Sequence, residues 1–442
     1  MTSHRSAFRG LVALAAALAL AVVAGCGGSD SEPESTTAEP AAGEVSGSVS
    51  ILGPWTRDQQ KSFEAVLDGF RDTQPKVDVK YTSAGDSTVT VLGTAVAGGN
   101  PPDIAVIPQP GLVRDFQAQG ALEPLDFAKD VIADNFPASL IDLGTIDGKL
   151  YSLMFKAANK STVWYNVGAF EAAGVTPPET FEQLREVAAT ITASGLPAYS
   201  VGGADGWTLT DLFENIYLRQ AGPEKYDQLA VHEIPWTDAS VKSALTTMAE
   251  VLGDDATIAG GRSRALQTDF ATSAESVFSD PPKAAMIIEG DFVPAAVAGK
   301  TELEPGTGYG VFPFPSVDGS GAMVVGGGDS LVTFKQTPAS KALIEYLATP
   351  EAAAIWARRG GFSSPNENVS PDVYPDDISR RIATAIAEAE TFRFDMSDLA
   401  PAKFGGTPGQ GEFKLLQDLL AEPDSVDETA AALEAAAAKA FK

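Results

Sequence analysis

Alternating strand-like and helix-like segments follow residue 46, and their order restricts the fold more than any other feature of the chain. The runs 49–52, 77–81 and 104–107 are short and apolar or alternating, as strands are. The runs 63–70 and 89–96 repeat apolar residues at the spacing of one helix face. Strand, helix, strand, helix, strand is the order of an α/β layer, and the last run suits a buried parallel strand.

The pattern changes after residue 147. Two strand-like runs, 148–154 and 162–166, flank a polar segment, 156–161, which we interpret as the first passage between two lobes. Helices dominate the chain after this passage, and an apolar strand returns at 284–288. Capping boxes and prolines after cap residues indicate helix starts at Thr180 with Gln183, Ser425 with Glu428, Thr337–Pro338 and Thr349–Pro350.

Residues 47–442 exceed the size at which one hydrophobic core keeps growing, so we expect two lobes. The strand-rich segments flank a helix-rich middle, which favours discontinuous lobes over two domains in tandem. We therefore predict an α/β fold with one lobe from 47–155 and 283–330 and a second from 156–282 and 331–442.

The first residues have the layout of a signal peptide. Two arginines precede an uncharged run, 10–24, and Ala24-Gly25 stands directly before Cys26. The run is shorter than the about 20 residues of a spanning helix. It resembles a bacterial lipoprotein signal, so we expect 1–25 to be removed and Cys26 to carry lipid; the alternative is an ordinary secretory signal. Residues 26–46 are polar and small, which predicts a flexible tether.

Charge and composition exclude several classes of protein. The net charge of −28 opposes nucleic-acid binding, which depends on Lys and Arg against phosphates. Cys26 is the only cysteine, so no disulfide or cysteine chemistry is expected in the folded body. Two histidines and no Gly-x-Ser-x-Gly pattern leave no basis for a His-based triad or a multi-histidine metal site. No later segment is long and apolar enough to span a membrane. We expect no cofactor and no metal.

A series of short motifs in a fixed order resembles the carbohydrate-type (family 1) extracellular solute-binding proteins of ABC importers. The motifs are Pro102-Asp103-Ile104, Gly148-Lys149-Leu150-Tyr151, Trp164-Tyr165-Asn166, Pro178-Glu179-Thr180-Phe181, Ala285-Met286-Ile287, Glu289-Gly290-Asp291-Phe292, Leu347-Ala348-Thr349-Pro350-Glu351 and Arg359-Gly360-Gly361-Phe362 with Ser364-Pro365-Asn366. Each is weak alone, and the specificity comes from their order over essentially the whole chain.

This resemblance implies a periplasmic-binding-protein-like fold: two α/β lobes, a multi-strand hinge and a ligand in the cleft. It also implies a monomer that closes on its ligand and docks on a membrane permease. Gly206-Trp207 with Asp211 and Glu214, and the run 218–224, are similar to members that bind α-glucosides. The expected ligand is therefore a carbohydrate, an α-glucoside or another oligosaccharide.

Sugar binding needs carboxylates, amides and cations for the hydroxyls and an aromatic plate for the ring. The candidate ligand contacts are Trp55, Arg57, Asp86, Gln109, Lys156, Asn159, Trp207, Asp211, Glu289, Asp291, Phe292, Gly328 and Asp329. The first four follow predicted strands, where an α/β lobe places its ligand-facing loops.

Each candidate also has a structural interpretation. Asp86 and Gln109 suit helix caps or turns, Lys156 and Asn159 suit hinge hydrogen bonds, and residues 327–329 suit a hinge turn. We expect Glu289 and Asp291 to share one strand face. Trp207, in a glycine-flanked loop, is the preferred stacking plate. The core tryptophans are expected to be Trp164 and Trp356, and Trp236 is expected to staple a helix start.

Three alternatives stay open. Glu289 and Asp291 could be the paired carboxylates of a glycosidase, although sequence does not distinguish a catalytic pair from a binding pair. The solute could be a phosphodiester, favoured by Arg57 and Lys156, or a polyamine, favoured by the acidic surface. A purely structural envelope lipoprotein would bind no ligand.

Overall fold

The computed structural model describes residues 45–442, except the side chains of residues 387 and 388. The predicted signal peptide, 1–25, and all but the last two residues of the predicted tether, 26–46, lie outside the described residues. The described residues 45–442 form one compact unit. In the described part of the chain, no helix combines the length and the apolar character needed to cross a membrane.

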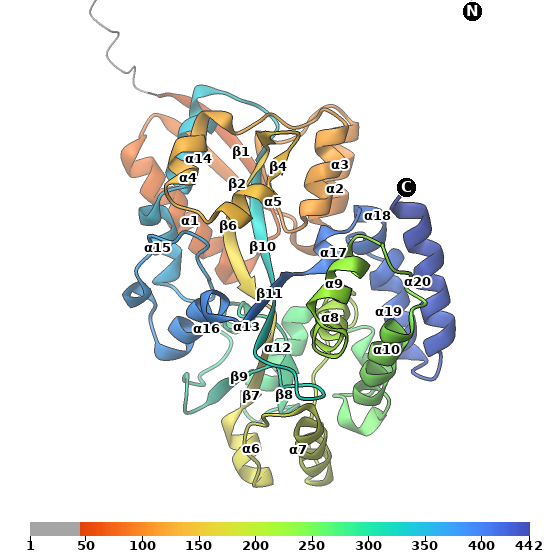
Figure 1. The fold of residues 1–442 in the computed structure, drawn as a ribbon. Helices are drawn as coiled ribbons and strands as arrows, with labels where there is room; N and C mark the ends of the chain where they lie inside the picture. Colours follow the sequence, from red (N-terminus) through yellow and green to blue (C-terminus); the bar gives the residue numbers. More distant parts are fainter. Residues whose placement is uncertain (1–44) are drawn as a thin grey trace, which may run out of the picture. The chain divides into compact units, whose positions relative to one another are not determined.

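A six-stranded sheet forms the centre of the first lobe (Figure 1). Its strands β1 (Gly47–Gly53), β2 (Val77–Ser83) and β3 (Ile104–Ile107) are parallel, as predicted. The long strand β10 (Met323–Thr333) is antiparallel to β3 and to β6 (Ser152–Asn159) and parallel to β11 (Thr391–Phe394).

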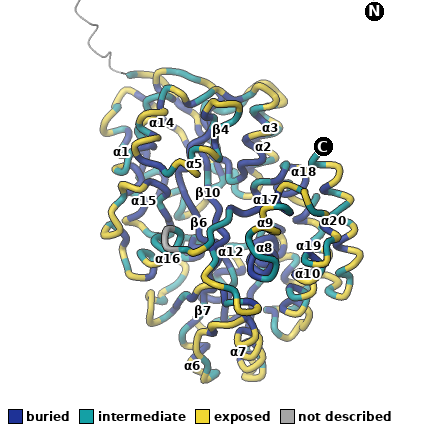
Figure 2. The backbone as a smooth tube through the Cα atoms, in the orientation of Figure 1, coloured by how far each residue is buried: buried dark blue, intermediate teal, exposed yellow. Residues whose placement is uncertain are grey.

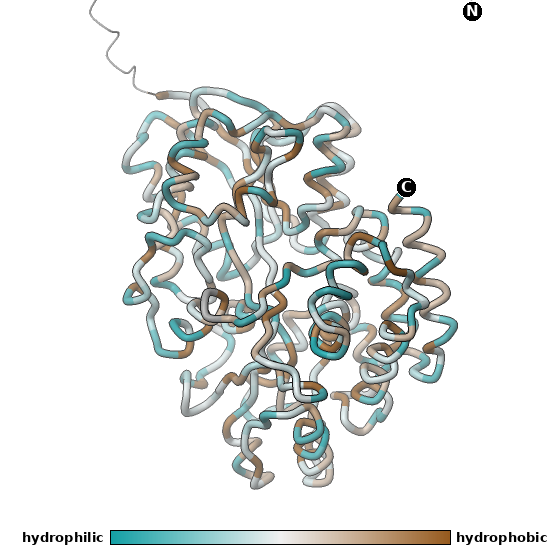
Figure 3. The backbone as a smooth tube through the Cα atoms, viewed as in Figure 1, coloured by the Kyte–Doolittle hydropathy of each residue, from teal (hydrophilic) through white to brown (hydrophobic). Residues whose placement is uncertain are grey.

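Amphipathic helices bury their apolar faces against this sheet. The predicted stripe of α1 (Arg57–Thr73), Phe63, Val66, Leu67 and Phe70, is fully buried. The other helices of this lobe are α2 (Thr88–Ala97), α3 (Pro110–Ala118), α4 (Lys129–Ala133), α5 (Ala138–Leu143), α14 (Pro338–Leu347) and α15 (Pro350–Ala357). Figure 3 shows hydrophobic and hydrophilic stretches alternating along these outer helices, as expected when one face of each is buried.

The second lobe has a smaller, antiparallel sheet in the order β8-β7-β9. These strands are β7 (Thr162–Asn166), β8 (Met286–Ile288) and β9 (Tyr309–Pro313). Its helices are α6 (Val167–Ala173), α7 (Phe181–Ala193), α8 (Trp207–Ala221), α9 (Pro223–Ala230), α10 (Ala239–Leu252), α11 (Arg262–Ala265), α12 (Phe270–Phe278), α13 (Val293–Val297), α16 (Asp377–Glu388), α17 (Met396–Leu399), α18 (Ala402–Gly405), α19 (Gly411–Ala421) and α20 (Val426–Ala440). Almost all of α8 is buried, so this helix is the centre of the lobe.

Short elements complete the description. They are β4 (Thr145–Ile146), β5 (Lys149–Leu150) and the 3₁₀ turns η1 (Gly85–Ser87), η2 (Asp126–Ala128), η3 (Asp255–Thr257) and η4 (Pro371–Val373).

Strands β6 and β10 run along the middle of the molecule from the first sheet toward the second (Figure 1), and Figure 2 shows this middle as buried. The sequence predicted a polar connection at 156–161, but β6 continues through Lys156 to Asn159. The reason is pairing: Lys156 lies opposite Asp329 and Asn159 lies opposite Gly326 on β10. Residues 327–329 likewise belong to β10 rather than to a hinge turn, with a register shift between Asp329 and Ser330.

Two segments differ from the lobes expected from the sequence. In the segment 283–330, β8 and β9 pair with β7 in the second lobe, and only β10 joins the first sheet. In the segment 331–442, α14 and α15 share the hydrophobic core of β1 and α1. Apolar strands and helices look alike in either lobe, so the sequence pattern does not show which sheet each one joins.

The predicted helix starts have mixed outcomes. Thr180 with Gln183 forms the capping box of α7, and Thr337 and Thr349 cap α14 and α15 through their side chains. The capping box predicted at Ser425 is wrong: its hydroxyl donates to the carbonyl of Glu422, so it makes no cap bond to α20.

The core tryptophans match the prediction, since Trp164 and Trp356 are fully buried. Trp236 is also buried, and its ring lies 5.5 Å from Phe213 and 5.2 Å from Phe404, so it belongs to the core of the second lobe rather than only to a helix start.

Candidate functional site

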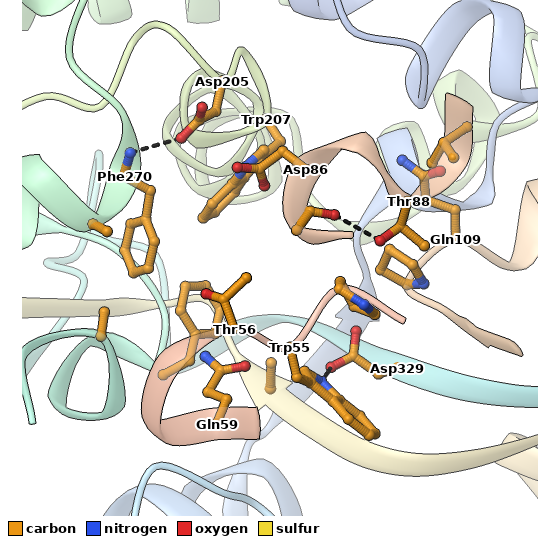
Figure 4. Close-up of a pocket in the computed structure, with 18 of the residues that line it drawn as sticks. Trp55, Thr56, Gln59, Asp86, Thr88, Gln109, Asp205, Trp207, Phe270 and Asp329 are labelled. Carbon is orange, nitrogen blue, oxygen red and sulfur yellow. Dashed lines mark hydrogen bonds between the residues drawn. The ribbon is translucent and has the colours of Figure 1, made fainter. Parts of the chain in front are cut away.

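A cavity of about 430 Å³ lies between the two lobes. The loops after β1, β2 and β3 form its wall on the first lobe, and the starts of α8 and α12 form the wall opposite (Figure 4). The strands β6 and β10 and the helix α17 pass beneath both walls. The cavity therefore touches both lobes and the segments that connect them.

Most of the candidate contacts from the sequence line this cavity. They are Trp55, Arg57, Asp86, Gln109, Lys156, Trp207, Phe292, Gly328 and Asp329. Four candidates lie behind the wall instead, namely Asn159, Asp211, Glu289 and Asp291. Lining residues that the sequence analysis did not single out include Thr56, Gln59, Thr88, Lys160, Asp205, Asp269, Phe270 and Asp398.

Trp55 connects the hydrophobic core to the cavity. Its indole is buried among aromatic rings, 4.7 Å from Phe63 and 4.8 Å from Trp356 between centroids, so this candidate ligand contact is also a core tryptophan. Its Nε1 donates a 2.6 Å hydrogen bond to Oδ2 of Asp329. Because the ring is packed on several sides, this hydrogen bond fixes the orientation of a carboxylate at the cavity.

The rings of Trp207, Phe270 and Phe292 form an aromatic wall, with centroids 5.2, 5.7 and 5.3 Å apart. Trp207 is the first residue of α8 and follows Gly206, whose φ is +83°. A Cβ at Gly206 would lie 2.7 Å from Cβ of Phe413, so glycine permits both the turn and the close packing. An aromatic surface of this kind suits the apolar face of a sugar ring.

Carboxylates from both lobes surround this aromatic wall (Figure 4). Asp205 accepts a 2.6 Å hydrogen bond from the backbone N–H of Phe270. Burial raises the pKa of Asp205 to about 7 against that hydrogen bond, and the charges of Asp86 and Asp269 add to the effect. Burial and then Asp269 also raise the pKa of Asp86, while a hydrogen bond from Trp207 lowers it. Asp86 comes from the first lobe, so acidic groups face each other across the cavity.

Two buried side chains present polar atoms to the cavity. Lys156 is 3% exposed, and its ammonium lies 5.3 Å from the centroid of Phe292. It makes no ion pair within 4 Å and no hydrogen bond among residues 45–442. Gln109 is 5% exposed and donates from Nε2 to the carbonyl of Gly406, while its Oε1 accepts nothing from the described residues. A ligand hydroxyl can satisfy both groups.

Arg57 lies at the edge of the cavity and contacts the opposite lobe. Its Nη1 lies 2.9 Å from Oε1 of Glu275 on α12, with the two side chains 47% and 35% exposed. Its φ of +50° is in the left-handed region, which is uncommon for a residue with a side chain. Arg57 therefore connects the lobes directly in this structure.

Two of the four candidates behind the wall, Asn159 and Asp291, take part in the connection between the lobes. Asp291 accepts hydrogen bonds from the backbone N–H of Asn159, at 3.1 Å, and from the hydroxyl of Ser363. Oδ1 of Asn159 accepts from the N–H of Ser161. The expectation that Glu289 and Asp291 share a strand face is wrong, because β8 ends at Ile288, Glu289 has no regular structure and Asp291 begins a turn.

Lys160 is the centre of a buried cluster of carboxylates. Its Nζ lies 3.1 Å from Oδ1 of Asp211 and 3.2 Å from Oδ2 of Asp398, and it donates to Oδ2 of Asp395. Burial disfavours the charged form of Lys160, but the three acids outweigh it and hold its pKa well above the usual value. Lys160 and Asp398 reach the cavity, whereas Asp211 and Asp395 do not. Among residues 45–442, no group of three or more His, Cys, Asp or Glu side chains is arranged to hold a metal ion.

Comparison with known proteins places the chain in a family. The model of the bacterial extracellular solute-binding proteins matches residues 53–354. The alpha-glucosides-binding periplasmic protein AglE of Rhizobium meliloti is 36% identical over 81% of this chain and 80% of its own. The osmoprotective compounds-binding protein GgtB of Synechocystis is 32% identical over 83% and 86%.

Solved structures agree on the fold. The bacterial solute receptor AcbH, described as having an exclusive preference for β-D-galactopyranose, superposes with a TM-score of 0.79. The match covers 90% of this chain and all of the other, at 20% identity. The two lobes and the strands that connect them are therefore those of a known fold. The chain belongs to the bacterial extracellular solute-binding protein family.

Proposed function

We propose that this protein captures an α-glucoside outside the cytoplasmic membrane and delivers it to an ABC permease. The observation that carries the proposal is the cavity itself, in which an aromatic wall of Trp207, Phe270 and Phe292 faces hydrogen-bonding groups from both lobes. The choice of ligand is supported by the relative AglE, whose name gives alpha-glucosides as what it binds.

The size and polarity of the cavity suit such a ligand. Its volume of about 430 Å³ falls within the range of about 300–1,000 Å³ found for small-molecule sites. Hydrogen bonds to charged groups contribute about 1.5–3 kcal/mol each. Four such bonds, to groups such as Asp329 and Lys156, sum to about 6–12 kcal/mol, which brackets the roughly 8 kcal/mol of micromolar binding.

Calorimetric titration of residues 45–442 with glucose, α-linked and β-linked glucosides and galactose tests the proposal. We expect saturable binding of an α-glucoside. We further expect Trp207→Ala to weaken it at least tenfold, because the aromatic plate is lost. Val231→Ala is the control, since Val231 is 59% exposed and does not line the cavity. Saturable binding of β-glucosides alone would refute the choice of ligand, and no binding of any sugar would refute carbohydrate capture.

A second candidate ligand is an osmoprotective compound, because GgtB is 32% identical to this chain. A panel of compatible solutes in the same titration separates the two. Binding of an osmolyte at least tenfold tighter than of any α-glucoside would favour the second candidate.

Catalysis is not part of the proposed function. Glu289 and Asp291, the pair that could have formed a glycosidase site, both lie behind the cavity wall, where a substrate in the cavity does not reach them. We expect an α-glucoside to be recovered unchanged after long incubation with the protein. Glucose released at a rate that scales with protein concentration would contradict this.

Attachment to the membrane and closure of the lobes complete the proposal. Cys26, the predicted lipid attachment site, lies outside the described residues, and we expect Cys26→Ala to release the protein from the membrane fraction. We also expect a monomer whose radius of gyration in X-ray scattering falls when the ligand is added. An unchanged radius at saturation would count against closure.

A further inference from the structure

The buried cluster around Lys160 contains more negative than positive groups. Asp211, Asp395 and Asp398 contact one ammonium group, and their exposed fractions are 0%, 0% and 7%. Three ionised carboxylates around one cation would leave two uncompensated buried charges. Isolated buried charges are strongly unfavourable, and carboxyl groups that share a site do not all ionise together. At least one carboxyl of the cluster therefore keeps its proton in the folded protein.

Hydrogen bonding separates Asp395 from the other two carboxyls. Burial raises the pKa of Asp211 well above its usual range, against the charge of Lys160, but Asp211 does not reach the cavity. Asp395 accepts from Lys160, from the hydroxyl of Ser397 at 2.7 Å and from the backbone N–H of Asp398 at 2.9 Å. Lys160 and these hydrogen bonds hold the pKa of Asp395 well below its usual range, although burial acts in the opposite direction. Asp398 accepts only from Lys160, at 3.2 Å, among the described side chains and backbone groups. Burial, and then the charge of Asp395, raise the pKa of Asp398 to about 8.

Asp398 is also the acid of this cluster that reaches the cavity. It belongs to α17, directly after β11 leaves the first sheet, and it lines the cavity together with Lys160. One of its oxygens contacts Lys160, which leaves the other available to a molecule in the cavity. A neutral carboxyl group there donates one hydrogen bond, which the other acids around the cavity do not do when ionised.

We propose that Asp398 is a ligand contact that donates a hydrogen bond from its neutral carboxyl group to an oxygen of the bound glycoside, and that Lys160 positions it. The proposal rests on the function proposed above. It adds a residue that determines specificity, since a protonated Asp398 favours an uncharged ligand with an exposed acceptor oxygen. It also makes binding dependent on pH, because the ionised carboxylate loses the proton to donate and repels that oxygen.

The groups that face Asp398 come from several elements. They are Lys160 after β6, Asp395 before α17, Asp329 on β10 and Glu412 on α19, with Asp211 and Glu214 on α8 beyond them. The charged side chains of α3, α9 and α18, which also pack on α17, are exposed or half-buried, namely Arg114, Asp115, Glu224, Lys225, Asp227 and Lys403. Apart from Lys160, the groups that face Asp398 are acids, so they oppose its ionisation.

The affinity of the wild-type protein for its best α-glucoside, measured by calorimetry between pH 6 and pH 10, tests the proposal without a variant. The proton-bound form is the binding form, so affinity is retained below the pKa of about 8 and is lost above it. Through Asp398 we expect Kd to be about tenfold higher at pH 9 than at pH 7, since one pH unit above a pKa leaves about one tenth of the group protonated. Asp205 also lines the cavity and has a pKa of about 7, so its titration adds to any change between pH 6 and pH 8.

Asp398→Asn provides the matched comparison. Its amide donates a hydrogen bond at every pH, so we expect a weaker Kd that lacks the rise between pH 8 and pH 9. A change below pH 8 that remains in this variant comes from Asp205. The control is Asp418→Asn, in an exposed ion pair with Lys414 on α19, which should retain the wild-type profile. A wild-type Kd that is constant across this range would overturn the proposal. A Kd that falls with rising pH would also overturn it, because Asp398 would then act as an acceptor.

A measurement on the free protein separates this proposal from the proposed function. The carbon-13 NMR signal of the Asp398 carboxyl carbon is assigned as the signal that is missing in Asp398→Asn. In wild-type protein without any sugar, this signal should titrate near pH 8. If no sugar binds but this titration is seen, the proposed function fails and the protonated carboxyl remains. If a sugar binds but Asp398 titrates near pH 4, the proton-donor role fails and the proposed function remains.

Discussion

The two sides of the cavity are built in different ways. On the first lobe, Trp55, Asp86 and Gln109 each follow a strand of a parallel sheet, at the edge where such sheets place their ligands. On the second lobe, the wall comes from the starts of two helices, at Trp207 on α8 and at Phe270 on α12. The first side follows a general rule of α/β folds, whereas the second depends on which helices the chain brings to the cavity.

The polar groups on the walls and those in the connection beneath them differ in their exposure to solvent. Asp269 on the walls is exposed, so water competes with a ligand for its carboxylate. Lys160, Asp211 and Asp395 in the connection are buried, and the ammonium of Lys160 contacts both carboxyl groups. We therefore expect substitutions in the connection to affect mainly stability and substitutions on the walls to affect mainly binding. The predictions below test this division, starting with the largest expected effect.

Lys160→Met should produce the largest loss of stability. The variant leaves Asp211, Asp395 and Asp398 buried without their cation, and breaking a buried ion pair by removing one partner costs about 3–5 kcal/mol. Chemical denaturation at pH 7 measures the loss. Lys414→Met removes a cation from an exposed pair and should cost less than about 1 kcal/mol.

A double variant checks the explanation. Adding Asp395→Asn to Lys160→Met removes one of the uncompensated charges and should restore part of the lost stability. A double variant less stable than Lys160→Met alone would show that packing, rather than charge, explains the loss.

Asp329→Asn should mainly reduce affinity. The amide still accepts the hydrogen bond from Trp55, so the local structure is retained, but the charged acceptor at the cavity is lost. Hydrogen bonds to charged groups are worth about 1.5–3 kcal/mol, which corresponds to a tenfold or greater increase in Kd. Calorimetry measures the change, and Asp130→Asn, on an exposed residue of α4, is the control. An unchanged Kd would show that Asp329 only supports Trp55.

The sequence predicted the first side of the cavity better than the second. The strand and helix periods of 47–107 specify where the chain turns, and those turns contain Trp55, Arg57 and Asp86. Parallel strands bring the turns at their carboxyl ends to the same edge of the sheet, independently of the rest of the fold. The ring at Trp207 was also identified, because a glycine before a bulky residue indicates an exposed helix start.

The contacts within the connection between the lobes were harder to predict from the sequence. Asp398 is 238 residues from Lys160 in the sequence, and no local pattern connects them. Glu289 and Asp291 have the composition of a ligand site, yet β8 ends before them at Ile288 and neither lines the cavity. β8 and β9 were assigned to the wrong lobe because an apolar strand does not specify the sheet it joins. These features depend on long-range pairing, which residue periodicity does not encode.

Asp205 provides a smaller test, based on pH. Its pKa in the folded protein is about 7 and therefore raised, so the folded state binds more protons than the unfolded state between about pH 4 and pH 7. Stability from this group is present at low pH and is lost as pH rises to 7. Asp205→Asn should melt at the same temperature as wild type near pH 4 and about 1–3 °C higher at pH 8, since the group is partly exposed. A difference that is equal at both pH values would contradict this.

Arg57 should have the smallest effect, and it tests whether the contact between the two walls contributes to binding. Arg57 and Glu275 join the lobes 2.9 Å apart, but both side chains are partly exposed, and such pairs contribute about 0–1 kcal/mol. Arg57→Gln should therefore raise Kd about two- to threefold at low salt and have no effect in 1 M salt, where the interaction is screened.

The matched control is Arg185→Gln, because Arg185 pairs with Glu250 at 2.8 Å within the second lobe, with similar exposure. Equal effects of the two variants on Kd would show that the contact between the walls has no special role. A tenfold effect of Arg57→Gln that persists in 1 M salt would show that Arg57 binds the ligand directly. Arg57, at the edge of the cavity, would then count among the wall residues that determine binding rather than stability.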